Sequence, residues 1–421
     1  MKPGWGAFPA TALMALTGVL AASIPTARAE LPMTAKCNAV GNISLDDRIA
    51  GCTAVIEAAT ARQQSVIFAH FRRAVFYLQK GEVDRAIADY DQIIEQDPNN
   101  LVARLRRAAA HVRKREIDVG LADYEKAIEL DPGDVYAYQG RAGVYLAKGD
   151  IDGAIADYDR VLLIHPDNVS ARVGRGLAYN SKGEPDPAMA DCNRAIEISP
   201  EHGIGRYCRG HVHIAKGNIE LAVADFTQAI QLNPRDYRSY LGRASAVRSR
   251  GDFEQALSDI KQAIELAPND PYLHRWSGTA HFQTGLMSEA LDDLGRSHEL
   301  DQKNLYTQLW LDLVRQRSGQ PSQLDEASKQ LDMSRWPAPI IRLFLGDTTF
   351  EGVLKAADDA SSVKMKGQLC EANFFAGELA LGHGATDEAV RLLHLAADAC
   401  PRRNLEWSAA NAELHRLKIK P

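Results

Sequence analysis

Few residues in this chain have the types and spacing that catalytic or metal chemistry requires. His211 and His213 lie two positions apart, and side chains with that separation on a helix point to different sides. The acidic residues Glu371, Asp387 and Glu388 have no nucleophile–base pair, glycine-rich phosphate loop or set of metal ligands beside them. We therefore expect no catalytic residue, no metal site and no cofactor.

The six cysteines offer a different chemistry, because they form three neighbouring pairs along the chain. A Cys-x-x-Cys motif is absent from the sequence, which argues against redox catalysis and zinc ribbons. An even number of cysteines in an exported protein is typical of disulfides. For the second pair, two plain core residues are the alternative. The candidate pairs are Cys37 with Cys52, Cys192 with Cys208, and Cys370 with Cys400.

Residues 1–29 have the pattern of a secretory signal peptide. Lys2 supplies the positive end, and Ala10–Ile24 is an apolar run too short for a typical membrane span. Residues 27–29 read Ala-Arg-Ala, a cleavage site before Glu30, and no cysteine follows the cut that could carry a lipid. We predict a periplasmic or secreted protein without a membrane span after processing. An uncleaved anchor is the alternative.

The charge balance argues against one class of partner. The chain has a net charge of −6, and removing Lys2 and Arg28 with the leader makes it −8. Nucleic-acid binding depends on positive surface charge. A mildly acidic chain is therefore not expected to bind nucleic acid in general.

A period of 34 residues organises the chain from residue 67 to residue 304. Such a period is typical of helix-turn-helix solenoids. We number seven units from residue 67, so that a proline stands at place 32 and stops the second helix of each unit. The prolines are Pro98, Pro132, Pro166, Pro200, Pro234 and Pro268, and the next place in the series is Gln302.

The other places of the unit agree with paired helices. Places 8 and 20 hold alanine or glycine in every unit, as close helix crossings require. Place 15 is glycine in six units, which suits a left-handed helix end. Arg115 is the exception, and with Gly120 in the same unit it leads us to expect a looser hairpin there. Place 24 is mostly large and fills the space beside each crossing, with Tyr90, Tyr124, Tyr158, Cys192, Phe226, Ile260 and Leu294.

This pattern resembles the tetratricopeptide repeat over seven consecutive units. The resemblance implies an all-α fold, a right-handed α-α superhelix whose first helices line a concave groove. We expect about eight repeats with helical caps, because the pattern returns at Cys370, with Gly377, Gly384 and Pro401 at places 8, 15 and 32. The expected divisions are 1–29 signal peptide, 30–66 half-repeat cap, 67–304 seven repeats, 305–369 divergent helical segment, and 370–421 eighth repeat with a closing helix.

Places 7 and 23 form a further regularity of charge. Place 23 is aspartate in all seven units, and place 7 is arginine in all but the last, where Ser277 replaces it. Antiparallel helices bring these places together, so we predict a ladder of Arg–Asp pairs along the solenoid. A track for a charged ligand is the alternative. The arginines are Arg73, Arg107, Arg141, Arg175, Arg209 and Arg243.

The resemblance also implies which side chains face the groove. In this family, places 2, 5, 9, 12 and 13 line the concave side. Aromatic and arginine side chains are common anchors of interfaces, and they concentrate in units 5–7. The predicted groove residues are Phe68, Phe71, Tyr136, Gln139, Asn180, Tyr207, His211, Arg238, Arg248, Tyr272 and Arg275.

Residues 305–418 resemble a bacterial envelope group, the periplasmic tetratricopeptide lipoproteins that serve as adaptors for a tail-processing protease and for peptidoglycan hydrolases. Trp336, Ile340-Ile341, Glu371 and Phe375 carry that likeness. It implies a non-enzymatic scaffold that binds a protein or peptide during envelope or peptidoglycan maintenance. The alternatives are a structural module that forms a homo-oligomer and, remotely, a cryptic envelope hydrolase.

Overall fold

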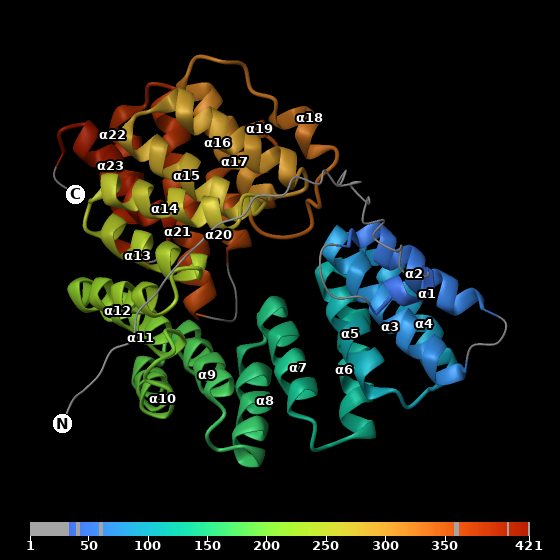
Figure 1. Cartoon of the computed structure of the whole chain (residues 1–421). Coiled ribbons are helices and arrows are strands. Elements are labelled where there is room, and N and C mark those ends of the chain that lie inside the picture. The colour runs from blue at the N-terminus through green and yellow to red at the C-terminus, as the bar shows by residue number, and fades with distance from the viewer. Residues whose placement is uncertain (1–32, 39–42, 59–61, 358–361, 402–403, 420–421) are drawn as a thin grey trace, which may run out of the picture. The chain divides into compact units, whose positions relative to one another are not determined.

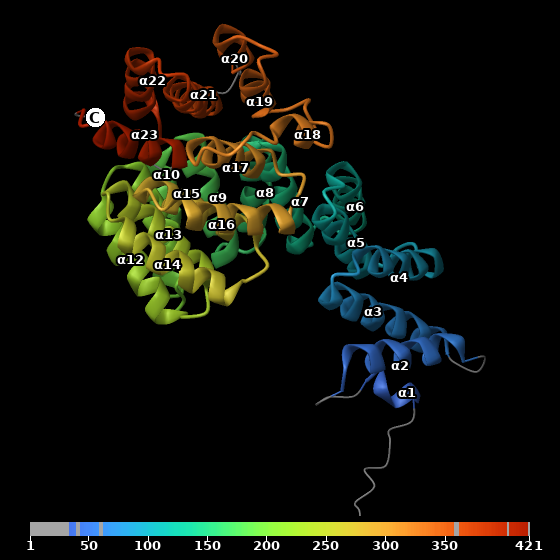
Figure 2. The ribbon, with the colours of Figure 1, turned by 90° about the horizontal axis from the view of Figure 1, so that it is seen from above.

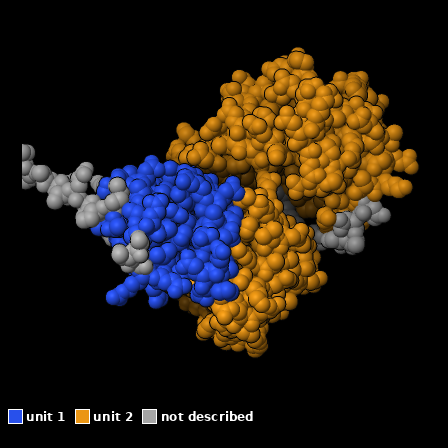
Figure 3. All heavy atoms as spheres, turned by 90° about the vertical axis from the view of Figure 1, so that its right-hand side faces the viewer, with its two compact units in different colours: residues 1–98 blue, residues 99–421 orange. Residues whose placement is uncertain are grey.

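The computed structural model describes residues 33–38, 43–58, 62–357, 362–401 and 404–419, and its regular secondary structure in those ranges consists of α-helices joined by turns and loops. The expected all-α fold is therefore confirmed. The chain divides into two compact units, residues 1–98 and residues 99–421, which Figure 3 colours separately. The predicted signal peptide lies outside the described residues. Among the residues that are described, no helix is both long enough and apolar enough to cross a membrane.

The N-terminal unit contains a cap and the first repeat. Its helices are α1 (Met33–Lys36), α2 (Leu45–Glu57), α3 (Gln63–Lys80) and α4 (Val83–Gln96). A disulfide joins Cys37, which follows α1, to Cys52 on α2. Both cysteines pack with Ala69 and Phe76 of α3, so the cap covers the first helix of repeat 1 with apolar surface.

In the C-terminal unit, six further helix pairs stack in chain order, and Figure 1 shows them from cyan to yellow-orange. Each pair is one repeat, so repeat 2 begins at residue 101 and repeat 7 at residue 271. The pairs are α5 (Leu101–Arg113) with α6 (Ile117–Leu130), α7 (Val135–Lys148) with α8 (Ile151–Ile164), α9 (Val169–Lys182) with α10 (Pro185–Ile198), α11 (Ile204–Ala215) with α12 (Ile219–Leu232), α13 (Tyr237–Ser249) with α14 (Phe253–Leu266), and α15 (Pro271–Thr284) with α16 (Met287–Leu300).

The turn of repeat 2 corrects one expectation. Arg115 adopts φ +65°, the left-handed conformation that glycine supplies at the same place in the other repeats. The amide of Glu116 donates to the carbonyl of His111 (2.9 Å), as the amide of Asp150 donates to Tyr145 in repeat 3 (2.8 Å). The hairpin of repeat 2 is therefore not looser, because its backbone closes with the same hydrogen bond despite the larger residue.

Six Arg–Asp pairs run along the repeats, as the sequence predicts. In each pair the Nε and Nη2 of arginine donate to the two carboxylate oxygens of the aspartate 16 residues later, at 2.6–2.9 Å. The six aspartates are buried, with 2–5% of their surface exposed. In repeat 7, where serine replaces arginine, Asp293 accepts instead from Nδ1 of His281 (2.8 Å). The ladder is thus a structural feature that joins the two helices of each repeat.

The described residues from 305 onwards form seven more helices. Two of them, α19 and α20, are short, with eight and seven residues. They share one core with repeat 7, in which Trp310 packs against Phe282, Phe374 and Phe375. The helices are α17 (Leu305–Arg317), α18 (Leu324–Ser328), α19 (Ala338–Leu345), α20 (Phe350–Ala356), α21 (Ser362–Gly382), α22 (Thr386–Ala399) and α23 (Leu405–Arg416).

Two more disulfides lie in the C-terminal unit. Cys192 on α10 is bonded to Cys208 on α11, which links repeat 4 to repeat 5. Cys370 on α21 is bonded to Cys400, directly after α22. All three neighbouring pairs considered from the sequence are thus disulfides in the structure.

Candidate functional site

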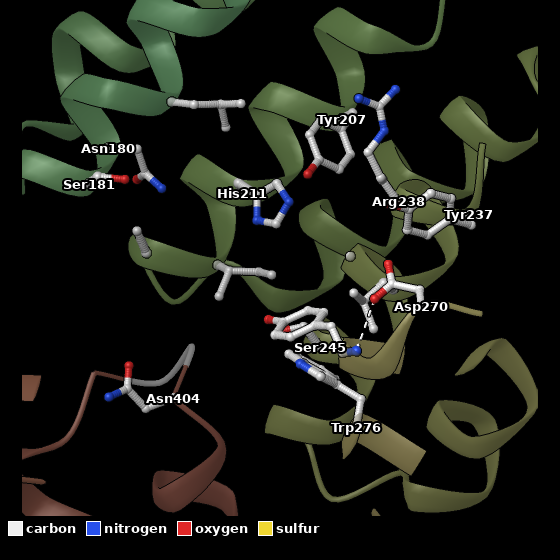
Figure 4. Close-up of a pocket in the computed structure, with 16 residues that line it drawn as sticks. Asn180, Ser181, Tyr207, His211, Tyr237, Arg238, Ser245, Asp270, Trp276 and Asn404 are labelled. Atoms are coloured by element: carbon white, nitrogen blue, oxygen red, sulfur yellow. Dashed lines mark hydrogen bonds between the residues drawn. The ribbon is translucent and has the colours of Figure 1, made fainter. Parts of the chain in front are cut away.

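A hollow of about 520 Å³ lies on the face formed by the first helices of repeats 4–7. Its lining comes from α9, α11, α13 and α15, together with Asn404 just before α23. Figure 4 shows Tyr207, His211, Arg238 and Trp276 around this space, with Asn404 at its edge. We call this hollow the groove pocket. Five predicted groove residues line it, namely Asn180, Tyr207, His211, Arg238 and Tyr272.

The α11 side of the groove pocket is an aromatic cluster. The rings of Tyr207 and His211 meet edge to face at 4.7 Å, and Phe226 of α12 lies behind both at 6.1 and 5.1 Å. Phe226 reaches this position because Gly242 has no side chain, since a Cβ there would lie 2.4 Å from the phenylalanine ring. Burial raises the pKa of Tyr207 to about 12, so its phenol stays neutral.

Arg238 supplies the positive charge at the rim of the groove pocket. Its guanidinium lies 5.8 Å from the centre of the Tyr207 ring, and its Nε donates to Asp236 at 2.8 Å. The side chain remains 55% exposed, so a ligand can reach it from solvent. A cation held over an aromatic ring is a preorganised anchor for an acidic or carbonyl oxygen.

The α15 side of the groove pocket combines two aromatic rings with one polar atom that has no partner among the described residues, and a second such atom lies on α9. Tyr272 is 43% exposed and its ring tilts over Trp276 at 5.8 Å. The backbone amide of Tyr272 donates to Asp270 (2.9 Å), the bond drawn in Figure 4. Within the described structure, neither Nε1 of Trp276 nor Oδ1 of Asn180 has a hydrogen-bond partner. Both atoms are buried, and they leave one donor and one acceptor unused beside the groove pocket.

Arg248 differs from the expectation for a groove residue. Its side chain is only 1% exposed, and its guanidinium lies 4.3 Å from the centre of the Trp276 ring, away from open solvent. Burial lowers the pKa of Arg248 to about 10, with the carboxylate of Glu406 acting in the opposite direction. The reason is tertiary, because helix α23 covers this part of the groove face.

Helix α23 is held on the inner side of repeats 6 and 7 by several contacts. Gln283 of α15 donates to the hydroxyl of Ser408 (2.9 Å), and Arg416 donates to the carbonyl of Phe282 (3.1 Å). Leu405 packs on the cluster that contains Trp276 and Val247. Figures 1 and 2 both show α23 beside α15. The chain's own C-terminal helix therefore closes one end of the groove pocket, which sequence periodicity does not reveal.

The remaining predicted groove residues lie outside the groove pocket. Arg275 is half-buried between the rings of Tyr272 and Tyr306, and it donates to Asn304 at 3.0 Å. Tyr136 on α7 is 71% exposed, and Gln139 on the same helix donates to Asn168. In the N-terminal unit, Phe68 is half-exposed and Phe71 meets Tyr90 edge to face.

The two histidines of α11 have separate environments, as their spacing suggests. His211 lines the groove pocket, whereas Nε2 of His213 lies 3.7 Å from Asp225 of the ladder. Burial lowers the pKa of His213. Across the described ranges, no cluster of three histidine, cysteine or acidic side chains could hold a metal ion.

These features define a class, an α-α solenoid with a partly closed concave pocket. Models of the tetratricopeptide repeat match residues 105–164, 141–202, 207–271 and 243–304, and a second such model matches residues 67–100. The matches cover more than half of the sequence, so the chain belongs to the tetratricopeptide repeat family. Members of this family are generally non-enzymatic scaffolds that bind protein or peptide partners, and the fold of this chain suggests a protein-binding scaffold.

Three solved structures are similar to this chain at low sequence identity. A tetratricopeptide repeat protein from Parabacteroides merdae is 19% identical, with a TM-score of 0.49 over 59% of this chain and 98% of its own. A thermophilic protein of the same kind from Thermus thermophilus is 19% identical, with a TM-score of 0.39 over 43% and 98%. YrrB, described as having an unusual peptide-binding site, is 22% identical, with a TM-score of 0.31 over 42% and 92%. No curated protein matches the chain.

Proposed function

We propose that this protein is an exported scaffold whose groove pocket binds an extended segment of a partner protein. The observation that carries the proposal is the pocket itself, a hollow of about 520 Å³ lined by Tyr207, Arg238, Tyr272 and Trp276. Tyrosine, tryptophan and arginine supply most binding energy at protein interfaces. The amides of Asn180 and Asn404 at its edges suit the donors and acceptors of a peptide backbone.

The setting that we propose is the bacterial cell envelope. Three disulfides are compatible with an oxidising compartment outside the cytoplasm. The predicted signal peptide and the likeness of residues 305–418 to envelope adaptor lipoproteins point the same way. The protein would then bring a protease, a wall hydrolase or a synthase to its place of action. It would do so by binding, with the chemistry supplied by the partner.

The proposal is tested by crosslinking inside cells that export the full chain. A photo-crosslinking residue at Tyr207 or Tyr272 reports on the groove pocket, and one at the exposed Glu265 of α14 serves as the control. We expect both groove positions, and not the control, to capture the same envelope protein. Purified partner should then bind the scaffold directly. Self-crosslinks alone would favour the homo-oligomeric alternative.

Substitutions then connect the captured partner to the chemistry of the groove pocket. Tyr272→Ala and Arg238→Ala should each weaken the partner's affinity about tenfold or more, because each removes an exposed anchor from the pocket rim. Circular dichroism checks that the fold is unchanged. Lys126→Ala, on the exposed surface of α6, is a matched control. This variant should bind the captured partner with the same affinity as the wild type. Unchanged affinity for both groove variants would contradict this location of the site.

A further inference from the structure

Helices α21 and α23 each carry two glutamates seven residues apart, a spacing that places both on one side of a helix. They are Glu371 and Glu378 on α21, and Glu406 and Glu413 on α23. Glu378, Glu406 and Glu413 are buried, and the carboxylate of Glu371 lies against Tyr306 and Trp336. Buried glutamates are rare unless they are paired with a cation. We call this set the carboxylate seam.

In one half of the seam, Glu378 faces Glu413. Arg317 of α17 donates to both carboxylates, at 2.9 and 3.2 Å, and Arg416 contacts Glu413 from the same helix. Oε1 of Glu378 has no hydrogen-bond partner in the described structure. Burial, followed by the charge of Glu413, raises the pKa of Glu378 to about 8 although Arg317 acts against both effects.

In the other half, Glu371 faces Glu406. The hydroxyl of Tyr306 and Nε1 of Trp336 both donate to Oε2 of Glu371, at 3.0 and 2.6 Å. Burial, followed by the charge of Glu406, raises the pKa of Glu371 to about 8, with Trp336, Tyr306 and Arg275 opposing the rise. Burial also raises the pKa of Glu406. Arg275 of α15, Arg248 of α13 and Trp310 of α17 oppose this rise in the pKa of Glu406.

The seam joins α23 to the rest of the C-terminal unit at the closed end of the groove pocket. Asn404, which lines the groove pocket, directly precedes α23, and Leu405 packs against Trp276, another lining residue. Any loosening of α23 therefore changes the pocket and uncovers Arg248 beneath it. We propose that the carboxylate seam makes the docking of α23 depend on protons, so that mildly acidic conditions hold the groove pocket closed and alkaline conditions loosen its end.

The direction in which the docking of α23 changes with pH follows from proton linkage. While α23 is docked, the pKa values of Glu371 and Glu378 are about 8. The release of α23 removes the charges of Glu406 and Glu413 and admits water to this side of α21, so both pKa values fall towards the ordinary 4.5. Between these pH values, Glu371 and Glu378 of α21 retain protons while α23 is docked and lose them when α23 is released. The docked state is thus fully favoured below about pH 4.5 and loses stability as the pH rises towards 8. Each retained proton changes the opening equilibrium by up to about tenfold per pH unit.

Amide hydrogen exchange of the full chain tests this inference without a ligand. We expect the opening equilibrium of α23, after correction for intrinsic exchange rates, to increase more than about tenfold between about pH 5.5 and about pH 7.5. Helices α9 and α10, which lie outside the seam, are the internal control and should change little. Protection of α23 that does not vary with pH would overturn the proposal.

Two isosteric variants assign the effect to the seam. Glu371→Gln and Glu378→Gln keep the shape of the side chain but cannot ionise, so each should reduce the pH dependence of α23 opening by up to about tenfold per pH unit. Glu388→Gln, on the exposed surface of α22 beside Arg391, should leave it unchanged. A wild-type pH dependence in both seam variants would overturn the proposal, even if α23 opens with pH in the native chain. This result is independent of whether a groove partner is found.

Discussion

The Arg–Asp ladder predicts that replacing one arginine will cost more than breaking an ordinary surface ion pair. In repeat 3, Nε and Nη2 of Arg141 donate to the two carboxylate oxygens of Asp157 at 2.9 and 2.7 Å. Asp157 is 4% exposed, whereas the Arg141 side chain is 20% exposed. Arg141→Met keeps most of the aliphatic stem beside Tyr138 and Tyr145 and removes only the charge and its donors.

The expected loss in the free energy of unfolding for Arg141→Met lies between two limits. Breaking a fully buried pair costs about 3–5 kcal/mol because a charge remains unpaired in the interior, whereas an exposed pair contributes only about 0.2–1 kcal/mol. Asp157 is near the buried limit, but the partial exposure of Arg141 lets solvent approach once the guanidinium is gone. We therefore expect a loss of about 2–3 kcal/mol in the free energy of unfolding for Arg141→Met.

Repeat 7 supports this reasoning within the same chain. Ser277 replaces the ladder arginine there, and the side chain of Asp293 is 23% exposed and bonded to His281. The aspartate without its arginine is thus more accessible to water than the six paired ones. The one repeat without a ladder arginine therefore does not keep its aspartate fully buried, as expected if a buried carboxylate without a cation is costly.

The assay is urea denaturation followed by circular dichroism, combined with hydrogen exchange of α7 and α8, because repeat arrays can unfold in parts. Lys126→Met is the control, since Lys126 pairs with Glu129 on the surface of α6 and both side chains are at least half exposed. Its cost should stay below about 0.5 kcal/mol. An equally small cost for Arg141→Met would refute the view that the ladder stabilises the repeats through buried carboxylates.

Three further predictions concern packing and crosslinks. Gly210→Ala should destabilise the fold by about 1–2 kcal/mol in a thermal melt, because its Cβ would lie 2.8 Å from the ring of Phe226. Gly143→Ala should stabilise it by about 0.5–1 kcal/mol, because no atom lies within 4 Å of the new Cβ; the opposite order of melting temperatures would contradict both. Replacing Cys192 and Cys208 by alanine should cost about 3 kcal/mol, since the bond closes a loop with a sequence separation of 16. Equal urea midpoints for this variant and the wild type would count against that cost.

The repeats and their ladder could be predicted from the sequence because their contacts are local. Each Arg–Asp pair spans 16 residues within one helix hairpin, so a period of 34 repeats the same geometry in every unit. The expectation that the aromatic and arginine residues of repeats 5–7 share one face came instead from the resemblance to the tetratricopeptide repeat. The exception at Arg115 misled the sequence interpretation, because a backbone hydrogen bond compensates for the missing glycine.

The 34-residue period alone determined the class of protein, the order of its helices and the Arg–Asp pairs that join the two helices of a repeat. All of these follow from interactions between near neighbours in the chain. The extent of the groove pocket was decided only by tertiary structure. Arg248 looks like a groove residue by its place in the repeat, yet it is buried because α23 returns to it from more than 150 residues away. The carboxylate seam has the same origin. Its four glutamates are unremarkable in the sequence and acquire their shared burial only when α21 and α23 pack together.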